Sequence, residues 1–124
     1  MIVFVDHTRR GALNARLDEL KGYEKNWDGY EATPPSSEQI RIFRNVLKHL
    51  TILPSFVDCY PDGTLFLNYD YIDREDEILV EIVDENNFKL ITKLDFLHPE
   101  FYNLKALNQV IEIYHKSREK QIYD

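Results

Sequence analysis

The stretch SFVDCYPDGTLFLNYDY, residues 55–71, decides the fold of this chain. On both sides of the tetrapeptide Tyr60-Pro61-Asp62-Gly63, apolar and polar residues alternate with a period of two, which is typical of β-strands that bury one face. Proline suits the second position of a type I turn, and glycine can adopt the positive φ that closes a hairpin. The sequence therefore predicts an antiparallel hairpin with strands over 55–60 and 64–71.

The same alternation continues at 77–83 and 88–94, after the charged connection 72–76 and the polar turn 84–87. The positions that share the apolar face are Leu65, Leu67, Tyr69 and Tyr71, then Ile78, Val80 and Ile82, then Phe88, Leu90, Thr92 and Leu94. The other face carries Asn68, Asp70, Glu81, Lys89 and Lys93, as expected of a sheet solvated on one side. Strands that follow one another usually lie side by side, so we expect a four-stranded antiparallel meander.

Helical patterns flank these strands. Between Thr8 as N-cap and Gly22 as a left-handed C-cap, three leucines recur at helical spacing. Ser36 and Gln39 have the spacing of a capping box before an apolar face that continues to about residue 50. A third helix is predicted to start at His98-Pro99 and to bury Phe101, while a strand and a loose terminus are both possible for residues 1–5. The fold class is therefore α+β, with two N-terminal helices, a four-stranded meander and a C-terminal helix in two layers.

Length and composition bound the class of protein. A chain of 124 residues with 44% hydrophobic residues can bury one core without disulfides or metal ions, so we expect a single domain over 1–124. The lone Cys59 cannot form an internal disulfide, which favours a reducing, cytoplasmic setting. The apolar run at 1–5 is too short for a signal peptide or a membrane helix.

The negative charge is concentrated in one segment. Residues 54–97 hold 11 acidic and 3 basic residues, a local net charge of −8, against −7 for the whole chain. Nucleic-acid binding depends on lysine and arginine that neutralise phosphates. The sequence therefore argues against direct binding of nucleic acid and favours a basic protein partner.

No pattern indicates catalysis, a metal or a cofactor. The four histidines are scattered singly, and the four glycines form no phosphate-binding loop. Cys59 has acidic neighbours that raise a thiol pKa, so a buried structural cysteine is favoured over a nucleophile. We expect a protein without enzymatic activity and without a cofactor.

The segment NWDGYEATPP, residues 26–35, holds the only tryptophan. Asp28-Gly29 is typical of a turn, and Trp27 is interpreted as a core anchor rather than a ligand contact. Tyr30 is equally consistent with a core and a binding role. The candidate residues for partner binding are Tyr30, Asp70, Asp73, Glu75, Asp76, Glu77 and Glu81.

This segment, with the preceding Leu17-x-x-Leu20 and the following helix and Pro61-Asp62-Gly63 hairpin, resembles a group of small bacterial and phage-encoded proteins with a WDGYGA-x-P segment. The resemblance covers about residues 10–92 and implies a helix, this segment, a second helix and a β-meander. Glu31 stands where the group often has glycine, and Asn68-Tyr69 where it often has an acidic residue and tryptophan. The resemblance implies a setting rich in mobile elements and no residue roles beyond the motif.

Three classes of function stay open. The first is an acidic, non-enzymatic protein-binding module, such as an antitoxin, immunity protein or phage-encoded inhibitor, that engages the basic surface of a toxin, nuclease or nucleic-acid-binding enzyme. The second is a small enzyme or ligand-sensing domain with a pocket between the Trp27–Tyr30 loop and the sheet. The third is a structural subunit of a larger assembly. The acidic segment, together with the missing catalytic patterns, favours the first class.

Overall fold

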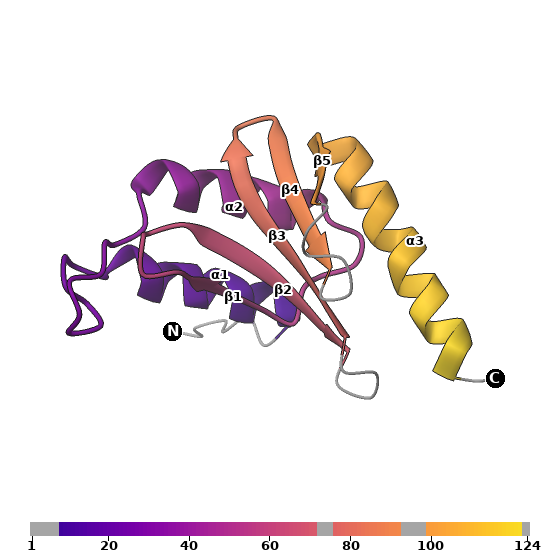
Figure 1. The fold of residues 1–124 in the computed structure, drawn as a ribbon, viewed down its shortest axis with the longest axis horizontal. Coiled ribbons are helices and arrows are strands. Elements are labelled where there is room, and N and C mark those ends of the chain that lie inside the picture. The colour runs from indigo at the N-terminus through magenta and orange to yellow at the C-terminus, as the bar shows by residue number, and fades with distance from the viewer. Residues whose placement is uncertain (1–7, 72–75, 93–98, 123–124) are drawn as a thin grey trace, which may run out of the picture.

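The computed structural model describes residues 8–71, 76–92 and 99–122, and side chains within these ranges except those of 71, 76 and 118–122. The elements follow one another as α1 (Arg9–Lys21), α2 (Ser37–His49), β1 (Phe56–Cys59), β2 (Leu65–Tyr71), β3 (Asp76–Asp84), β4 (Asn87–Thr92), β5 (Glu100–Tyr102) and α3 (Leu104–Ile122) (Figure 1). The predicted α+β class, with two helices before an antiparallel sheet and one after it, is confirmed. The possible strand at residues 1–5 lies outside the described residues.

The sheet has five strands in the order β1-β2-β3-β4-β5, all antiparallel. The predicted meander is therefore correct, but the count of four strands is wrong. The fifth strand, β5, pairs Phe101 with Lys89 of β4 at residues that were assigned to the start of the last helix. Phe101, predicted to be buried on a helix face, instead lies on a strand and is 56% exposed.

The last helix begins six residues later than predicted because its cap is Asn103 rather than His98-Pro99. The side-chain Oδ1 of Asn103 accepts a hydrogen bond from the backbone N–H of Ala106 at 2.8 Å. Its carbonyl oxygen accepts from the N–H of Leu107, also at 2.8 Å. Asparagine is among the best N-cap residues, so it outweighs the tolerance of proline in a first turn.

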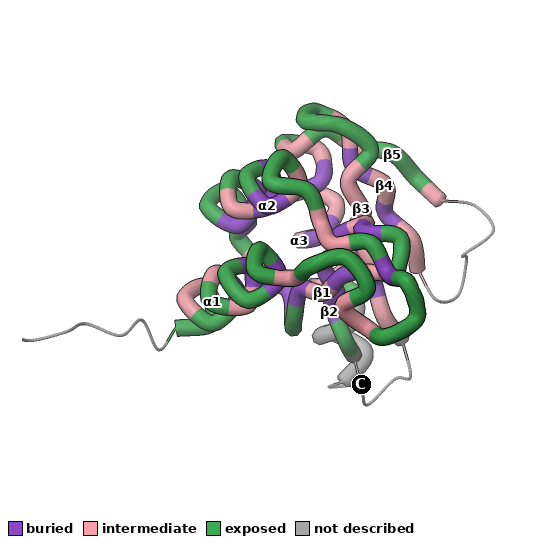
Figure 2. The backbone as a smooth tube through the Cα atoms, turned by 90° about the vertical axis from the view of Figure 1, so that its left-hand side faces the viewer, coloured by how far each residue is buried: buried purple, intermediate pink, exposed green. Residues whose placement is uncertain are grey.

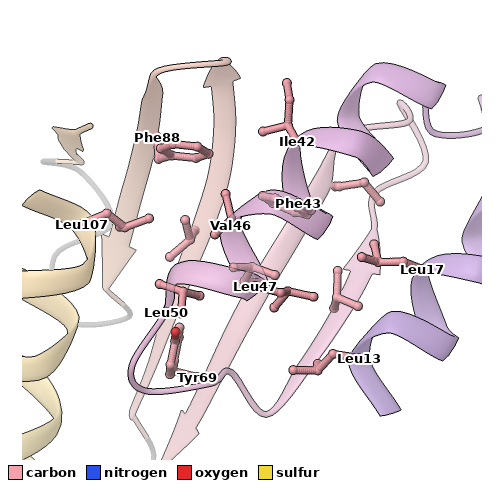
Figure 3. Packing of buried hydrophobic residues seen from close by; sticks show 14 of the residues in the cluster. Leu13, Leu17, Ile42, Phe43, Val46, Leu47, Leu50, Tyr69, Phe88 and Leu107 are labelled. Carbon is pink, nitrogen blue, oxygen red and sulfur yellow. The ribbon is translucent and has the colours of Figure 1, made fainter. Parts of the chain in front are cut away.

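The core lies between the sheet and the first two helices. Figure 2 shows α1 and α2 on one side of the strands, with buried segments between the two layers. Helix α2 contributes Phe43, Val46 and Leu47, which point toward the strands in Figure 3, and α1 contributes Leu13 and Leu17. The strand residues of the same cluster are Val57, Cys59, Leu65, Leu67, Tyr69, Ile78, Val80, Phe88 and Leu90. The alternation predicted from the sequence is therefore the one that faces the helices.

The predicted starts of the first two helices are confirmed, and the predicted C-cap of the first helix is wrong. Thr8 Oγ1 accepts from the N–H of Gly11 at 3.1 Å, and Ser36 Oγ accepts from the N–H of Gln39 at 3.2 Å. Gly22 ends α1 with a φ of −83°, which is right-handed and not the left-handed cap expected of it. Its N–H bonds the carbonyl oxygens of the last turn, so the helix ends without a positive φ.

Gln39 does not complete the capping box. Its Nε2 donates to the carbonyl oxygen of Gly63 at 3.0 Å, and its Oε1 accepts from the N–H of Leu65 at 2.9 Å. The amide therefore satisfies a donor and an acceptor at the start of β2 and ties α2 to the hairpin turn.

Helix α3 packs against the sheet through its first half, where Leu107 and Ile111 are fully buried. Asn108 joins it to the segment after α2, since its Nδ2 donates to His49 O and its Oδ1 accepts from Thr51 N, both at 2.9 Å. Further along, Ile113 is 65% exposed. Among the helices of the described chain, none combines the length and apolarity needed to cross a membrane.

Candidate protein-binding surface

One face of the sheet has no described helix over it (Figures 1 and 2). Side chains of a strand alternate between the two faces, so the residues between the core positions point to this side, which we call the open face. One cross-strand row of the open face consists of Asp58, Phe66, Glu81, Lys89 and Phe101. The neighbouring row consists of Phe56, Asn68, Leu79 and Ile91.

The open face exposes large apolar groups. Phe56 and Phe101 are 41% and 56% exposed, and the strand register places both on this face. A sheet face with no further contact would carry polar residues at these positions. Exposed apolar groups rimmed by polar residues are typical of protein interaction sites, so this face is the candidate site.

Three aromatic rings form an ordered cluster on the open face, which we call the aromatic cluster. The rings of Tyr60 and Phe66 are stacked, with centroids 4.4 Å apart, and Phe56 meets Phe66 edge to face at 6.5 Å. The hydroxyl of Tyr60 donates to Glu81 Oε2 at 3.2 Å. Burial, and then the negative charge and hydrogen bond of Glu81, raise the pKa of Tyr60 to about 12. The phenol therefore stays protonated at neutral pH and holds the Glu81 carboxylate in place.

A second carboxylate of this face is paired within the chain. Arg16 Nη2 donates to Asp58 Oδ1 at 3.0 Å, and Nη1 donates to Glu19 Oε2 at 2.9 Å and to the Tyr23 hydroxyl at 3.1 Å. The guanidinium also lies over the Tyr23 ring, with Cζ 5.7 Å from the centroid. Partial burial lowers the pKa of Arg16, but these partners outweigh it and the pKa is raised. This contact fastens α1 to the outer edge of the sheet.

The predicted acidic site residues fall into two groups. Asp70, Glu77 and Glu81 share the open face, with Asp70 directly opposite Glu77 across β2 and β3. Asp73 and Glu75 lie outside the described residues. Asp76 is the first residue of β3, and its side chain also lies outside the described set. The structure thus brings together three of the six predicted carboxylates.

Asn68, counted among the solvated residues from the sequence, is only 3% exposed, so that prediction is wrong. Its Nδ2 donates to Glu77 Oε2 at 3.1 Å. Its Oδ1 is buried and accepts no hydrogen bond in the described structure. Neighbours on both sides cover this short side chain, because Phe56 and Leu79 are its cross-strand partners.

Sequence reasoning missed the aromatic residues of the open face. The alternation that assigned Leu65 and Leu67 to the core also assigned Phe66 to the other face, so the signal was present. What the sequence could not show was the register that places Phe66 between Asp58 and Glu81.

The segment 26–34, which we call the clasp, is a loop held by hydrogen bonds among its own residues. Trp27 is half-buried, packs on Tyr23 with ring centroids 4.9 Å apart, and donates from Nε1 to Thr33 O at 2.7 Å. Asp28 Oδ1 accepts from the N–H groups of Tyr30 at 2.8 Å and Ala32 at 3.1 Å. Tyr30 itself is 87% exposed, so it has no part in the core.

The clasp rests on the hairpin turn that decides the fold. Thr33 N–H donates to Pro61 O at 2.8 Å. Gly63, with a φ of +91°, lies so close that a Cβ there would be 2.8 Å from the carbonyl oxygen of Pro34. A hollow of about 480 Å³ lies beside the clasp and is lined by Lys25, Asn26 and Glu31.

Two observations bear on covalent and metal chemistry in the described residues. Cys59 is buried, and burial, followed by the charges of Asp58 and Asp62, raises the pKa of its thiol to about 11. In the described ranges no group of three or more His, Cys, Asp or Glu residues is placed to hold a metal ion. A cavity of about 390 Å³ lies between α1 and β1 and is lined by Arg9, Ala12, Leu13, Arg16, Ser55, Phe56, Val57 and Asp58.

Comparison of the chain with models of known protein families, with curated proteins and with solved structures finds no match. The class of the protein is therefore stated from its fold alone. It is a small α+β domain in which helices pack on one face of a five-stranded meander sheet, and no described helix covers the other face.

Proposed function

We propose that this chain is a non-enzymatic protein-binding module that engages a basic protein surface through its open face. The observation that carries the proposal is the combination of exposed Phe56 and Phe101 with the carboxylates of Asp70, Glu77 and Glu81 on one face. Apolar groups supply affinity when buried, and the carboxylates select the partner's charge and orient its approach.

Charge supports a basic partner rather than a second acidic surface. The segment 54–97, which contains β1 to β4, carries a net charge of −8. Of the carboxylates on the open face, Asp58 pairs with Arg16 of α1, Glu81 lies opposite Lys89, and Asp70 lies opposite another acid, Glu77. Antitoxins, immunity proteins and phage-encoded inhibitors are classes of small acidic protein that act in this way, and we place the chain among them as part of the proposal.

The test reverses charges on the open face and compares them with reversals elsewhere. The partner is first isolated with the wild-type chain from the source organism, and its affinity is then measured by calorimetry. The triple variant Asp70→Lys, Glu77→Lys, Glu81→Lys should weaken binding by about tenfold or more, because each surface charge contributes roughly 0.2–1 kcal/mol and a reversal replaces attraction by repulsion. The weakening should shrink as salt is added.

The matched control is Glu24→Lys, Glu85→Lys, Glu112→Lys, which changes the net charge equally in the segment before the clasp, in the β3–β4 turn and in α3. It should bind the partner nearly as well as wild type. Equal weakening by both triple variants would show that only net charge matters, and full binding by the open-face variant would refute the proposed surface.

One observation favours a second candidate, a domain that senses a small ligand. The cavity of about 390 Å³ beside Arg9 and Arg16 falls in the size range of ligand sites and combines an apolar floor with cationic groups. A bound ligand raises the melting temperature by mass action, by the equivalent of about 2.7 kcal/mol at 100 times Kd. A thermal-shift screen with nucleotides and metabolites tests this candidate, and a screen without shifts would eliminate it.

A further inference from the structure

We propose that the aromatic cluster of the open face, together with Asp58 and Glu81, is a receptor for an arginine side chain of the protein partner. The inference rests on the proposed function and names the partner group that the open face selects.

The register places an aromatic ring between two carboxylates. Phe66 of β2 is directly opposite Asp58 of β1 and directly opposite Glu81 of β3. Side chains that face each other across antiparallel strands have Cβ atoms about 4.5–5.5 Å apart. A cation over this ring therefore lies within reach of both carboxylates at once.

The rings themselves attract a planar cation. The faces of aromatic rings carry negative charge, and Phe56 and Tyr60 enlarge the surface around Phe66 while packing holds them in place. A guanidinium stacks flat on such rings and donates from its edge to carboxylates, whereas an ammonium is a compact, strongly hydrated charge. The arrangement therefore selects arginine over lysine.

The chain already holds one guanidinium in this manner. Arg16 lies over the ring of Tyr23 and bonds Asp58 at 3.0 Å, at the border of the same face. The arginine of the partner would make the same kinds of contact one strand further into the sheet. Its guanidinium would lie over the Phe66 ring instead of the Tyr23 ring, and it would donate to Glu81 instead of Glu19.

Glu81 is prepared for a further donor. Among the described residues it accepts one hydrogen bond, from Tyr60, and a carboxylate has about four acceptor sites. Lys89 faces it across β3 and β4, yet no ion pair joins the two in the described structure. The Tyr60 hydroxyl fixes one carboxylate oxygen, so the other is positioned without the loss of side-chain freedom that binding usually costs.

The experiment uses three blocked tetrapeptides, of arginine, of lysine and of the uncharged isostere citrulline, titrated into the isotopically labelled full chain at low salt. The arginine peptide should bind several times more tightly than the lysine peptide, and the citrulline peptide should not bind measurably. Backbone amide shifts should concentrate at residues 56–60, 66 and 81.

Phe66→Leu keeps an apolar side chain and removes the ring. It should weaken the binding of the arginine peptide by about two- to fivefold, as expected for an exposed cation–π contact of roughly 0.5–1 kcal/mol. The binding of the lysine peptide should stay nearly unchanged. Glu81→Gln should weaken the binding of both peptides. Ile113→Ala removes an exposed apolar side chain from α3, outside the open face, and is the control that should change the binding of neither peptide.

Phe56→Leu gives an independent reading if Phe66→Leu lowers the melting temperature too far for titration. Equal binding of arginine and lysine peptides that neither ring variant alters would overturn the arginine receptor. The charge reversals at Asp70, Glu77 and Glu81 would still test the wider proposal separately. Sedimentation at low salt that shows a stable dimer, lost in Phe56→Leu, would also overturn the arginine receptor, because a second copy would then cover the open face.

Discussion

Replacing Gly63 by alanine tests the contact between the clasp and the hairpin turn. Gly63 has a φ of +91°, and the added Cβ would lie 2.8 Å from the carbonyl oxygen of Pro34 and 3.2 Å from Cγ2 of Thr33. The carbonyl belongs to a proline pair whose neighbour Thr33 is bonded to Pro61, so the oxygen cannot move away freely. The substitution must therefore shift the clasp, the turn or both.

The magnitude follows from three contributions, two that destabilise the fold and one that partly offsets them. A residue with a Cβ in the left-handed region costs about 1–2 kcal/mol relative to glycine. Overpacking against rigid backbone adds about 1–3 kcal/mol. Alanine also restricts the unfolded chain, which returns about 0.4–1 kcal/mol. Gly63→Ala should therefore lower the free energy of unfolding by about 2–4 kcal/mol, taking these contributions together.

Gly29→Ala is the matched control, because Gly29 has a φ of +79° but no atom lies within 4 Å of the added Cβ. The conformational cost and the unfolded-state contribution are common to both variants, so the difference between them isolates the contact with Pro34. Urea unfolding followed by circular dichroism measures both free energies. A difference below about 0.5 kcal/mol, less than the overpacking range, would refute the reasoning that the clasp presses on the turn.

Three further predictions concern single residues. Glu31 has a φ of 65°, so Glu31→Gly should raise the melting temperature by a few degrees and Glu31→Ala should not, because glycine removes a cost of about 1–2 kcal/mol and loses only part of it in chain entropy. The folded-state pKa of Tyr60, about 12, exceeds its unfolded value of 10.0. The contribution of Tyr60 to stability is therefore complete below pH 10 and is lost as the pH rises toward 12. Absorbance at 295 nm should show a phenol that ionises at this high pH, and its signal should be absent in Tyr60→Phe. Asn68→Val should be neutral or stabilise by about 1 kcal/mol in urea unfolding, since it removes the unpartnered Oδ1, and a loss above about 2 kcal/mol would show that its bond to Glu77 dominates.

Local patterns predicted the elements whose signals are contained in a few neighbouring residues. The spacing of Leu13, Leu17 and Leu20, the cap at Ser36 and the alternation around the hairpin each depend on residues within one or two turns, and each is correct in the structure. The strand β5 depends instead on an edge of β4 that is free to pair. No local pattern in three residues can report that edge, so the segment was assigned to the helix that follows it.

The same distinction explains Gln39 and Glu31. The spacing of Ser36 and Gln39 predicted a local capping box, but the turn at Gly63 offers the amide both a donor and an acceptor, and the distant partners are the ones it bonds. At position 31 no local pattern predicted a left-handed residue. Glu31 nevertheless has a φ of 65°, because the path of the clasp requires that conformation there.

The acidic residues of the open face oppose the self-association that its exposed aromatic residues would promote. Phe56 and Phe101 on an uncovered sheet face would promote pairing with the same face of a second copy. Two copies that meet face to face about a two-fold axis bring Asp70, Glu77 and Glu81 of one toward their equivalents in the other, and like charges at close range oppose that contact. The same carboxylates attract a basic partner. Added salt should therefore weaken the complex with the basic partner and promote self-association of the free chain. If the open face served only for self-association, added salt would strengthen both the complex and the self-association.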